Sequence, residues 1–220
     1  MTAIRAVIFD MDGLMFDTES VYYRINHDTA KELGFEMTKD FYRQFIGSDN
    51  RHYEKGVYDL VGDDALAERF LKLSYQRLDD EFLKGHVDYQ KGLIDLLEQL
   101  QAWKIPAVVA SSTKREMVDH LLTKLKVRNY FAGVVGGDEV HYAKPDPAIF
   151  NKAASLFDEE KDSMLVLEDS LNGIRAAHAA GIRVAMVPDL VAPNEESQEK
   201  AVAILDDLHE VIPYIESQNH

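Results

Sequence analysis

The sequence predicts an α/β fold, in which a Rossmann-like parallel sheet is covered by helices and carries an inserted all-helical segment. Short apolar runs rich in β-branched residues alternate with helical patterns through the second half of the chain. This alternation is typical of parallel sheets whose strands are buried on both faces. The stretch from about Phe16 to His86 breaks the alternation, because it holds no such run and is helical in period.

The expected strands are the short, continuous apolar runs of the chain. They lie at residues 6–9, 107–110, 134–135, 164–167 and 184–187, with a last one near 202–204.

Helices are expected between these strands. Leucines at 93, 96, 97 and 100 repeat at i, i+3, i+4 and i+7, which predicts a helix with one buried face. The segment 171–180 favours a helix that ends before Gly181, a residue type common just after a helix end. Asp146 followed by Pro147 is typical of an N-cap followed by a first-turn proline.

The inserted segment is expected to form helices separated by glycines. One predicted helix face carries Tyr22, Ile25 and Thr29, and a second carries Leu66, Phe70, Leu73 and Leu78. We therefore divide the chain into a core of residues 1–15 and 87–220 and a helical cap of residues 16–86. Because the insertion follows the first strand, the cap is expected over that strand's carboxyl end.

Composition excludes several classes of protein. Lys and Arg number 24 against 39 Asp and Glu, a formal charge of −15, which argues against nucleic-acid binding through a general basic surface. The chain has no cysteine, so disulfides, thiolate metal ligands and cysteine nucleophiles are absent. We see no signal peptide and no run of the ~20 apolar residues that a membrane span needs. A cytoplasmic protein without a membrane partner is expected, and a monomer is plausible.

Polar residues suited to phosphate or metal are expected at the ends of four strands. They are Asp10 with Asp12, Ser111, Lys144, and Glu168 with Asp169. Ligand sites in open α/β sheets lie outside the carboxyl ends of the strands, so these side chains are expected to converge. Carboxylates packed so closely repel one another unless a hard cation joins them, and Mg²⁺ prefers such oxygen ligands together with a substrate phosphate.

Simpler explanations exist for each residue taken alone. Asp10 and Asp12 could be surface aspartates in a turn, although Gly13 comes too early for a calcium loop of the EF-hand type. Thr113 with Glu116 fits a helix capping box, which we prefer for Thr113. Either acid of the second pair could merely cap the next helix, for which Ser170 is the better residue.

The four ordered motifs together resemble the haloacid dehalogenase superfamily, in its phosphatase and phosphomutase branch with a helical cap. That resemblance implies Asp10 as a nucleophile forming an aspartyl phosphate and Asp12 as general acid and base. It also implies phosphate binding by Ser111, Ser112 and Lys144. The implied Mg²⁺ site comprises Asp10, Asp12 through its carbonyl, and Asp169, with Glu168 beside the metal.

The resemblance further implies a small phosphorylated metabolite as substrate, of the sugar phosphate or nucleoside monophosphate class. The alternative is a β-phosphoglucomutase. Against it, Tyr22 stands where such mutases carry a cap histidine, and the loop from Ile46 to Arg51 matches their basic loop only with a one-residue shift. Lys91 also stands where the family usually has proline.

Two further classes are weighed against the enzyme. A receiver-type signalling switch also places acids, a hydroxyl and a lysine at strand ends, but it has its phosphoacceptor on a middle strand and no large cap. A catalytically silent binding protein is the other option. Asp10 and Asp12 are both present, so nothing visible in the sequence disables catalysis.

Overall fold

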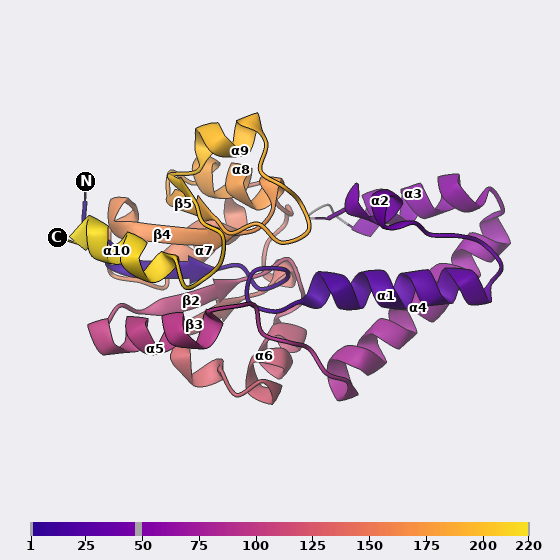
Figure 1. Ribbon diagram of the computed structural model, residues 1–220, viewed down its shortest axis with the longest axis horizontal. Coiled ribbons are helices and arrows are strands. Elements are labelled where there is room, and N and C mark those ends of the chain that lie inside the picture. Colours follow the sequence, from indigo (N-terminus) through magenta and orange to yellow (C-terminus); the bar gives the residue numbers. More distant parts are fainter. Residues whose placement is uncertain (1, 47–49, 220) are drawn as a thin grey trace. The chain divides into compact units, whose positions relative to one another are not determined.

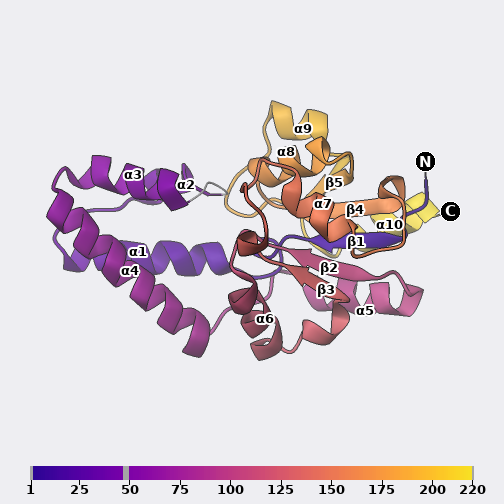
Figure 2. The ribbon, with the colours of Figure 1, turned by 180° about the vertical axis from the view of Figure 1, so that it is seen from behind.

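The computed structural model describes residues 2–46 and 50–219, which form two compact units (Figures 1 and 2). One unit comprises the chain up to Phe16 and from Tyr89 onward, and the other is Asp17–Asp88. Phe16 belongs to the first unit because it forms bridges with both Asp12 and Tyr89. The junctions therefore lie slightly beyond the expected limits of 16 and 86.

The first unit is built on a parallel sheet of six strands in the order β3-β2-β1-β4-β5-β6. The strands are β1 (Ala6–Phe9), β2 (Ala107–Ala110), β3 (Gly133–Val135), β4 (Met164–Glu168), β5 (Arg183–Met186) and β6 (Ala203–Ile204). Each coincides with an apolar run or lies within a residue of it, so the predicted fold class is confirmed. Every residue of β1, β2 and β4 is buried, which explains why these strands show no alternation of polar and apolar residues.

Helices cover both faces of this sheet. They are α5 (Leu93–Trp103), α6 (Arg115–Lys124), α7 (Ala148–Ala154), α8 (Leu171–Ala179), α9 (Glu195–Lys200) and α10 (Val211–Asn219), with short 3₁₀ turns at Arg128–Tyr130, Gly137–Glu139 and Lys161–Ser163. Phe150 of α7 and Ile174 of α8 share one buried cluster with Ala6 and Ile8 of β1. Helices α5 and α10, which contact each other, lie on the opposite face (Figures 1 and 2). The central strand β1 is thus enclosed by layers on both sides.

Two of the predicted helix ends are confirmed, and one is shifted. Ser170 caps α8, because its side chain accepts a hydrogen bond from the Gly173 amide, and Gly181 takes a left-handed φ of 71° after the helix end. The expected start at Pro147 is wrong by one residue, since α7 begins at Ala148. The Asp146 side chain still accepts a hydrogen bond from the Ala148 amide, at 2.9 Å.

The second unit is helical, with α1 (Thr18–Glu32), α2 (Lys39–Arg43), α3 (Asn50–Val61) and α4 (Asp64–Lys84). The predicted face of α4 is partly wrong. Phe70 and Leu78 are buried, but Leu66 and Leu73 are only half-buried, and Ser74 lies on the buried face instead. Helix α4 packs against both α1 and α3, and a small serine needs less room on its buried face than a leucine does. Among the helices described here, none combines the length and the apolar character that crossing a membrane requires.

Candidate active site

The predicted site residues of the first unit gather at the carboxyl edge of the central strands. Phe9 of β1 lies in register with Val109 of β2 and with Leu167 of β4. Parallel strands in this register end at the same edge, so Asp10, Ser111 and Glu168 emerge side by side. Asp10 is 6% exposed, Ser111 and Glu168 are not exposed at all, and Asp169 is 5% exposed.

The prediction that Lys144 ends a strand is wrong, because this residue lies in the loop that precedes α7, where its peptide bond to Pro145 is cis. Its side chain nevertheless reaches the same edge. Its Nζ donates to Asp10 Oδ1 at 2.5 Å and to Glu168 Oε1 at 2.6 Å. All three side chains are less than a tenth exposed. The ammonium therefore forms a buried bridge between the end of β1 and the end of β4.

The charged groups of this bridge shift one another's pKa values. Burial raises the pKa of the Asp10 carboxyl well above its usual range; the Lys144 ammonium opposes this rise, and the Glu168 and Asp12 carboxylates add to it. Burial alone would lower the pKa of Lys144, but Asp10 and Glu168 outweigh burial and hold that pKa above its ordinary value. Lys144 thus belongs to a group with more carboxylates than ammonium groups. A further cation beside Asp10 would stabilise its ionised form.

Glu168 is fixed on both of its oxygens. Oε1 accepts from Lys144, while Oε2 accepts from the Ser170 amide at 2.9 Å and the Ser170 hydroxyl at 3.0 Å. Gly173 of α8 leaves room for this carboxylate, since a Cβ there would collide with it. Glu168 therefore lies where it can hold Lys144 in place. The double role of Ser170, which caps α8 and also donates to Glu168, was not visible in the sequence.

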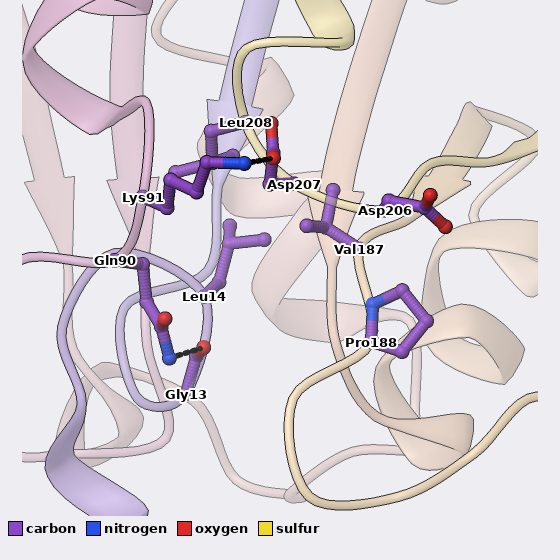
Figure 3. Close-up of a pocket in the computed structure, with 9 residues that line it drawn as sticks. All are labelled: Gly13, Leu14, Gln90, Lys91, Val187, Pro188, Asp206, Asp207 and Leu208. Carbon is purple, nitrogen blue, oxygen red and sulfur yellow. Dashed lines mark hydrogen bonds and ion pairs between the residues drawn. The ribbon is translucent and has the colours of Figure 1, made fainter.

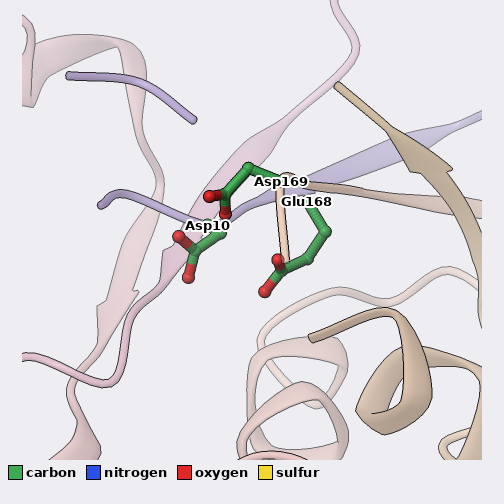
Figure 4. A group of neighbouring side chains, drawn as sticks. All are labelled: Asp10, Glu168 and Asp169. Carbon is green, nitrogen blue, oxygen red and sulfur yellow. The ribbon is translucent and has the colours of Figure 1, made fainter. Parts of the chain in front are cut away.

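Asp10, Glu168 and Asp169 form a group suited to a metal ion. One carboxylate oxygen of each residue lies within 4.8 Å of those of the other two, and all three residues are buried (Figure 4). Mg²⁺ prefers hard oxygen donors and is commonly held by one or two carboxylates together with a substrate phosphate and water. The donor set, the burial and the surplus of negative charge all fit such an ion.

Asp12 is held by the loop that follows β2. Its Oδ2 accepts from the Ser111 hydroxyl at 3.1 Å and from the Thr113 hydroxyl at 2.9 Å. The predicted capping box of Thr113 and Glu116 is wrong: the N-cap of α6 is Lys114, which makes no side-chain cap bond. The tertiary contact with Asp12 takes the Thr113 hydroxyl instead. Ser112, which lies between Ser111 and Thr113 in this loop, is exposed.

The loop after β1 is also anchored by Gln90, which lies where the chain returns to the first unit. Gln90 Nε2 donates to the Gly13 carbonyl at 2.8 Å, and the Gln90 amide donates to the Met15 carbonyl at 2.9 Å. A pocket of about 290 Å³ lies beside these residues (Figure 3). Its lining comprises Gly13, Leu14, Gln90, Lys91, Val187, Pro188, Asp206, Asp207 and Leu208. Lys91, which stands where the resemblance leads us to expect proline, pairs there with Asp207 at 2.5 Å. The contact between Gln90 and Gly13 was not visible in the sequence.

Comparison with known proteins identifies the family. Residues 7–187 match the family model of the haloacid dehalogenase-like hydrolases. The chain belongs to this family. The predicted family and the predicted enzyme class, a phosphomonoester hydrolase, are confirmed.

Three relatives illustrate the similarity of this haloacid dehalogenase-like hydrolase to known proteins. A phosphorylated carbohydrates phosphatase of Thermotoga maritima is 31% identical over 182 residues, covering 81% of this chain and 82% of the relative. A protein of Drosophila melanogaster named as a probable pseudouridine-5'-phosphatase is 30% identical over 214 residues, covering 94% and 90%. A crystal structure from Thermotoga maritima, provisionally described as a β-phosphoglucomutase, has a TM-score of 0.80 at 29% identity and covers 97% and 99%.

Proposed function

We propose that the protein is a Mg²⁺-dependent phosphatase that hydrolyses small phosphomonoesters through an aspartyl phosphate on Asp10. The observation that carries this proposal is the buried Asp10 carboxylate at the end of β1, bridged by Lys144 and flanked by the acidic pair at the end of β4. The substrate class we propose is sugar phosphates or nucleoside monophosphates. The names of the two phosphatase relatives, which refer to phosphorylated carbohydrates and to pseudouridine-5'-phosphate, support it.

Asp10 acts as the nucleophile. One of its carboxylate oxygens attacks phosphorus, and the bond between phosphorus and the ester oxygen breaks, with its electron pair leaving on that oxygen. Water then attacks the phosphorus of the aspartyl phosphate and releases inorganic phosphate and the Asp10 carboxylate. Covalent capture divides one difficult hydrolysis into two easier steps.

Asp12 moves the protons of both steps. In the first step its carboxylic acid protonates the leaving alkoxide, and in the second its carboxylate takes a proton from the attacking water. Such assistance contributes typically ~10²–10⁴-fold. Its place on the loop beside Asp10, with Oδ2 held by two hydroxyls, suits a group that must reach the ester oxygen.

Lys144, the Ser111 hydroxyl and the loop through Ser112 bind the phosphate. Phosphoryl transfer depends mainly on positioning and on neutralising the phosphate oxygens, and a fixed buried ammonium does both. Lys144 is held by two carboxylates, so its position is set before the substrate arrives.

We assign the Mg²⁺ ligands to the Asp10 and Asp169 carboxylates and the Asp12 carbonyl, with Glu168 beside them. The two Glu168 oxygens already accept hydrogen bonds from Lys144 and Ser170, which favours a supporting place for it. When bound, the ion supplies positive charge against the phosphate oxygens and the carboxylates.

A metal-removal experiment tests the function. Phosphate release from a panel of sugar phosphates and nucleoside monophosphates should be lost after exhaustive chelation and return on addition of Mg²⁺, since the carboxylates otherwise repel an anionic substrate. Calcium, which is larger and prefers more ligands, serves as the control ion. Full activity in the metal-free protein would contradict the assignment.

A glycine substitution tests the metal site separately. Gly13 has a φ of 80°, and a Cβ there would lie 2.5 Å from Asp169 Oδ2. We expect Gly13→Ala to displace Asp169 and to lower Mg²⁺ affinity or activity about 10–100-fold, as for other groups that position metal ligands. The matched control is Gly181→Ala, because Gly181 has a φ of 71° with nothing within 4 Å of a new Cβ. Equal losses of activity in both variants would show that backbone strain, and not displacement of Asp169, causes the effect.

The alternative is a β-phosphoglucomutase, favoured by the similarity to the Thermotoga maritima structure. In the second unit the Tyr22 ring packs on Phe82, with centroids 5.0 Å apart, and Arg51 lies in α3. The predicted mismatch between the loop from Ile46 to Arg51 and the basic loop of such mutases depends on residues 47–49, which lie outside the described residues.

Phosphorus NMR separates these two activities. With β-glucose 1-phosphate and a trace of the 1,6-bisphosphate, we expect free phosphate to accumulate if the compound is accepted at all. A mutase must instead return the phosphoryl group to the sugar before water takes it. Rapid formation of glucose 6-phosphate with little free phosphate would therefore overturn the hydrolase.

The cytoplasmic location, the monomeric state and the exclusion of nucleic-acid partners stay predictions.

A further inference from the structure

Thr113 makes a contact with Asp12 to which the proposed mechanism gives no role distinct from that of Ser111. Its Oγ1 donates to Asp12 Oδ2 at 2.9 Å, the shorter of the two hydroxyl contacts to that oxygen. The Ser111 hydroxyl donates to the same oxygen, and the Thr113 amide donates to Ser111 Oγ at 3.0 Å. The three residues thus form a closed ring of hydrogen bonds.

The backbone of Thr113 is fixed on both sides. Its amide donates to Ser111 Oγ, and its carbonyl accepts from the Gly137 amide at 2.9 Å. Gly137 can approach this loop because it has no side chain: a Cβ there would collide with the Ser112 carbonyl. The position of the Thr113 hydroxyl is therefore set by the fold, as a residue that orients a reacting group requires.

Counting donors separates the roles of the two hydroxyls. A serine hydroxyl has one proton to donate. When Ser111 donates that proton to a substrate phosphate, it cannot donate it to Asp12 as well. Thr113 is then the hydroxyl of this ring that still donates to Asp12.

We propose that Thr113 is the positioning residue of Asp12, holding Oδ2 of its carboxyl group while the Ser111 hydroxyl binds the substrate phosphate. With Oδ2 accepting from Thr113, the proton of the acid form lies on Oδ1, from which it passes to the leaving ester oxygen as the bond to phosphorus breaks. This role rests on the proposed phosphatase function. It is separate from metal binding and from the nucleophile.

The test compares two leaving groups. An alkoxide leaving from a sugar phosphate needs a proton, whereas p-nitrophenolate leaving from p-nitrophenyl phosphate hardly does. The ratio kcat/KM reports the first phosphoryl transfer and not the later hydrolysis. We expect Thr113→Val to lower kcat/KM about 10–100-fold for the sugar phosphate most active with the wild type, within the range of acid catalysis. The fall for p-nitrophenyl phosphate should be less than about threefold, because little acid catalysis is lost.

Two further variants complete the experiment. Thr113→Ser restores the hydroxyl and should recover most of the loss. Thr123→Val, the same change at an exposed site on α6, should leave both substrates unaffected. If Thr113→Val lowers the melting temperature too far for assay, Thr113→Ala replaces it and the same ratio decides.

The outcomes are distinct. Equal falls for both substrates, no fall for either, or failure of Thr113→Ser to recover activity would overturn the role of Thr113. A wild-type protein that releases phosphate from neither substrate would overturn the proposed function and this role with it. An active wild type with an unchanged ratio in the variants would overturn only the role of Thr113.

Discussion

Asp10→Asn should reduce turnover of phosphomonoesters by at least about 10⁴-fold, the upper range for loss of a proton-transfer group. The amide is a poor nucleophile toward phosphorus, and it also removes a negative charge beside Lys144, which donates to Asp10 at 2.5 Å. The fold should survive, because the side chain keeps its size. Turnover is followed as released phosphate, and mass spectrometry of the acid-quenched wild-type reaction should find phosphate on Asp10.

Asp12→Asn is the matched control for this prediction. It makes the same chemical change two residues away and leaves the nucleophile in place, so phosphate should still reach Asp10 from p-nitrophenyl phosphate. An Asp10→Asn protein with wild-type turnover and no deamidation would rule out the covalent route. Phosphate trapped on another residue would rule out Asp10 as the nucleophile.

Lys144→Met should lower the free energy of unfolding by about 3–5 kcal/mol, the usual cost of leaving a buried charge without its partner. Asp10 and Glu168 would then face each other without the ammonium, and neither carboxylate is more than 8% exposed. Phosphatase activity should be lost together with stability. Denaturant unfolding of the metal-free protein measures the first effect.

Two variants show whether the buried charge is the cause. Lys200→Met breaks the i,i+4 contact with Glu196, which is 3.6 Å long and partly exposed, and should change stability by only about 0.3–0.5 kcal/mol. Adding Glu168→Gln to Lys144→Met removes one of the stranded carboxylates and should recover part of the loss. Simple additivity of the two single changes would show that the residues do not interact.

The sheet could be predicted because its signal is local. A strand buried on both faces must be apolar along its length, and β1, β2 and β4 are each continuous runs of buried residues in the structure. Three of the polar positions, at Asp10, Ser111 and Glu168, followed from the same runs, because parallel strands deliver their ends to one edge. Lys144 reaches that edge from the loop before α7.

The inserted segment was correctly predicted to be helical, but the buried face of α4 was predicted only in part. Apolar periodicity placed Leu73 on the buried face of α4, whereas the structure buries Ser74 there. A helical pattern specifies a face only to within about one residue, and the neighbouring helix decides which side chains fit beneath it. The sequence of α4 alone does not contain that information.

Thr113 shows most clearly that a local sequence pattern does not determine the partner of a side chain. Its spacing from Glu116 satisfies a local capping rule, yet the hydroxyl bonds to Asp12, 101 residues earlier in the chain. The local backbone partner of a capping hydroxyl competes with every acceptor that the fold brings near it. A carboxylate acceptor forms a stronger hydrogen bond than a neutral one. The same reasoning applies to Ser170, which keeps its local cap and adds a bond to Glu168.

The sequence by itself determined the fold class, the family and the set of residues at the carboxyl edge, because apolar runs and the order of polar motifs along the chain are local properties. Only the tertiary structure decided how those residues pair: Lys144 between Asp10 and Glu168, Thr113 and Ser111 on one oxygen of Asp12, and Gln90 on the Gly13 carbonyl. These contacts join segments far apart in the chain. Their geometry follows from strand register and helix packing, which bring the segments together only after the core has formed.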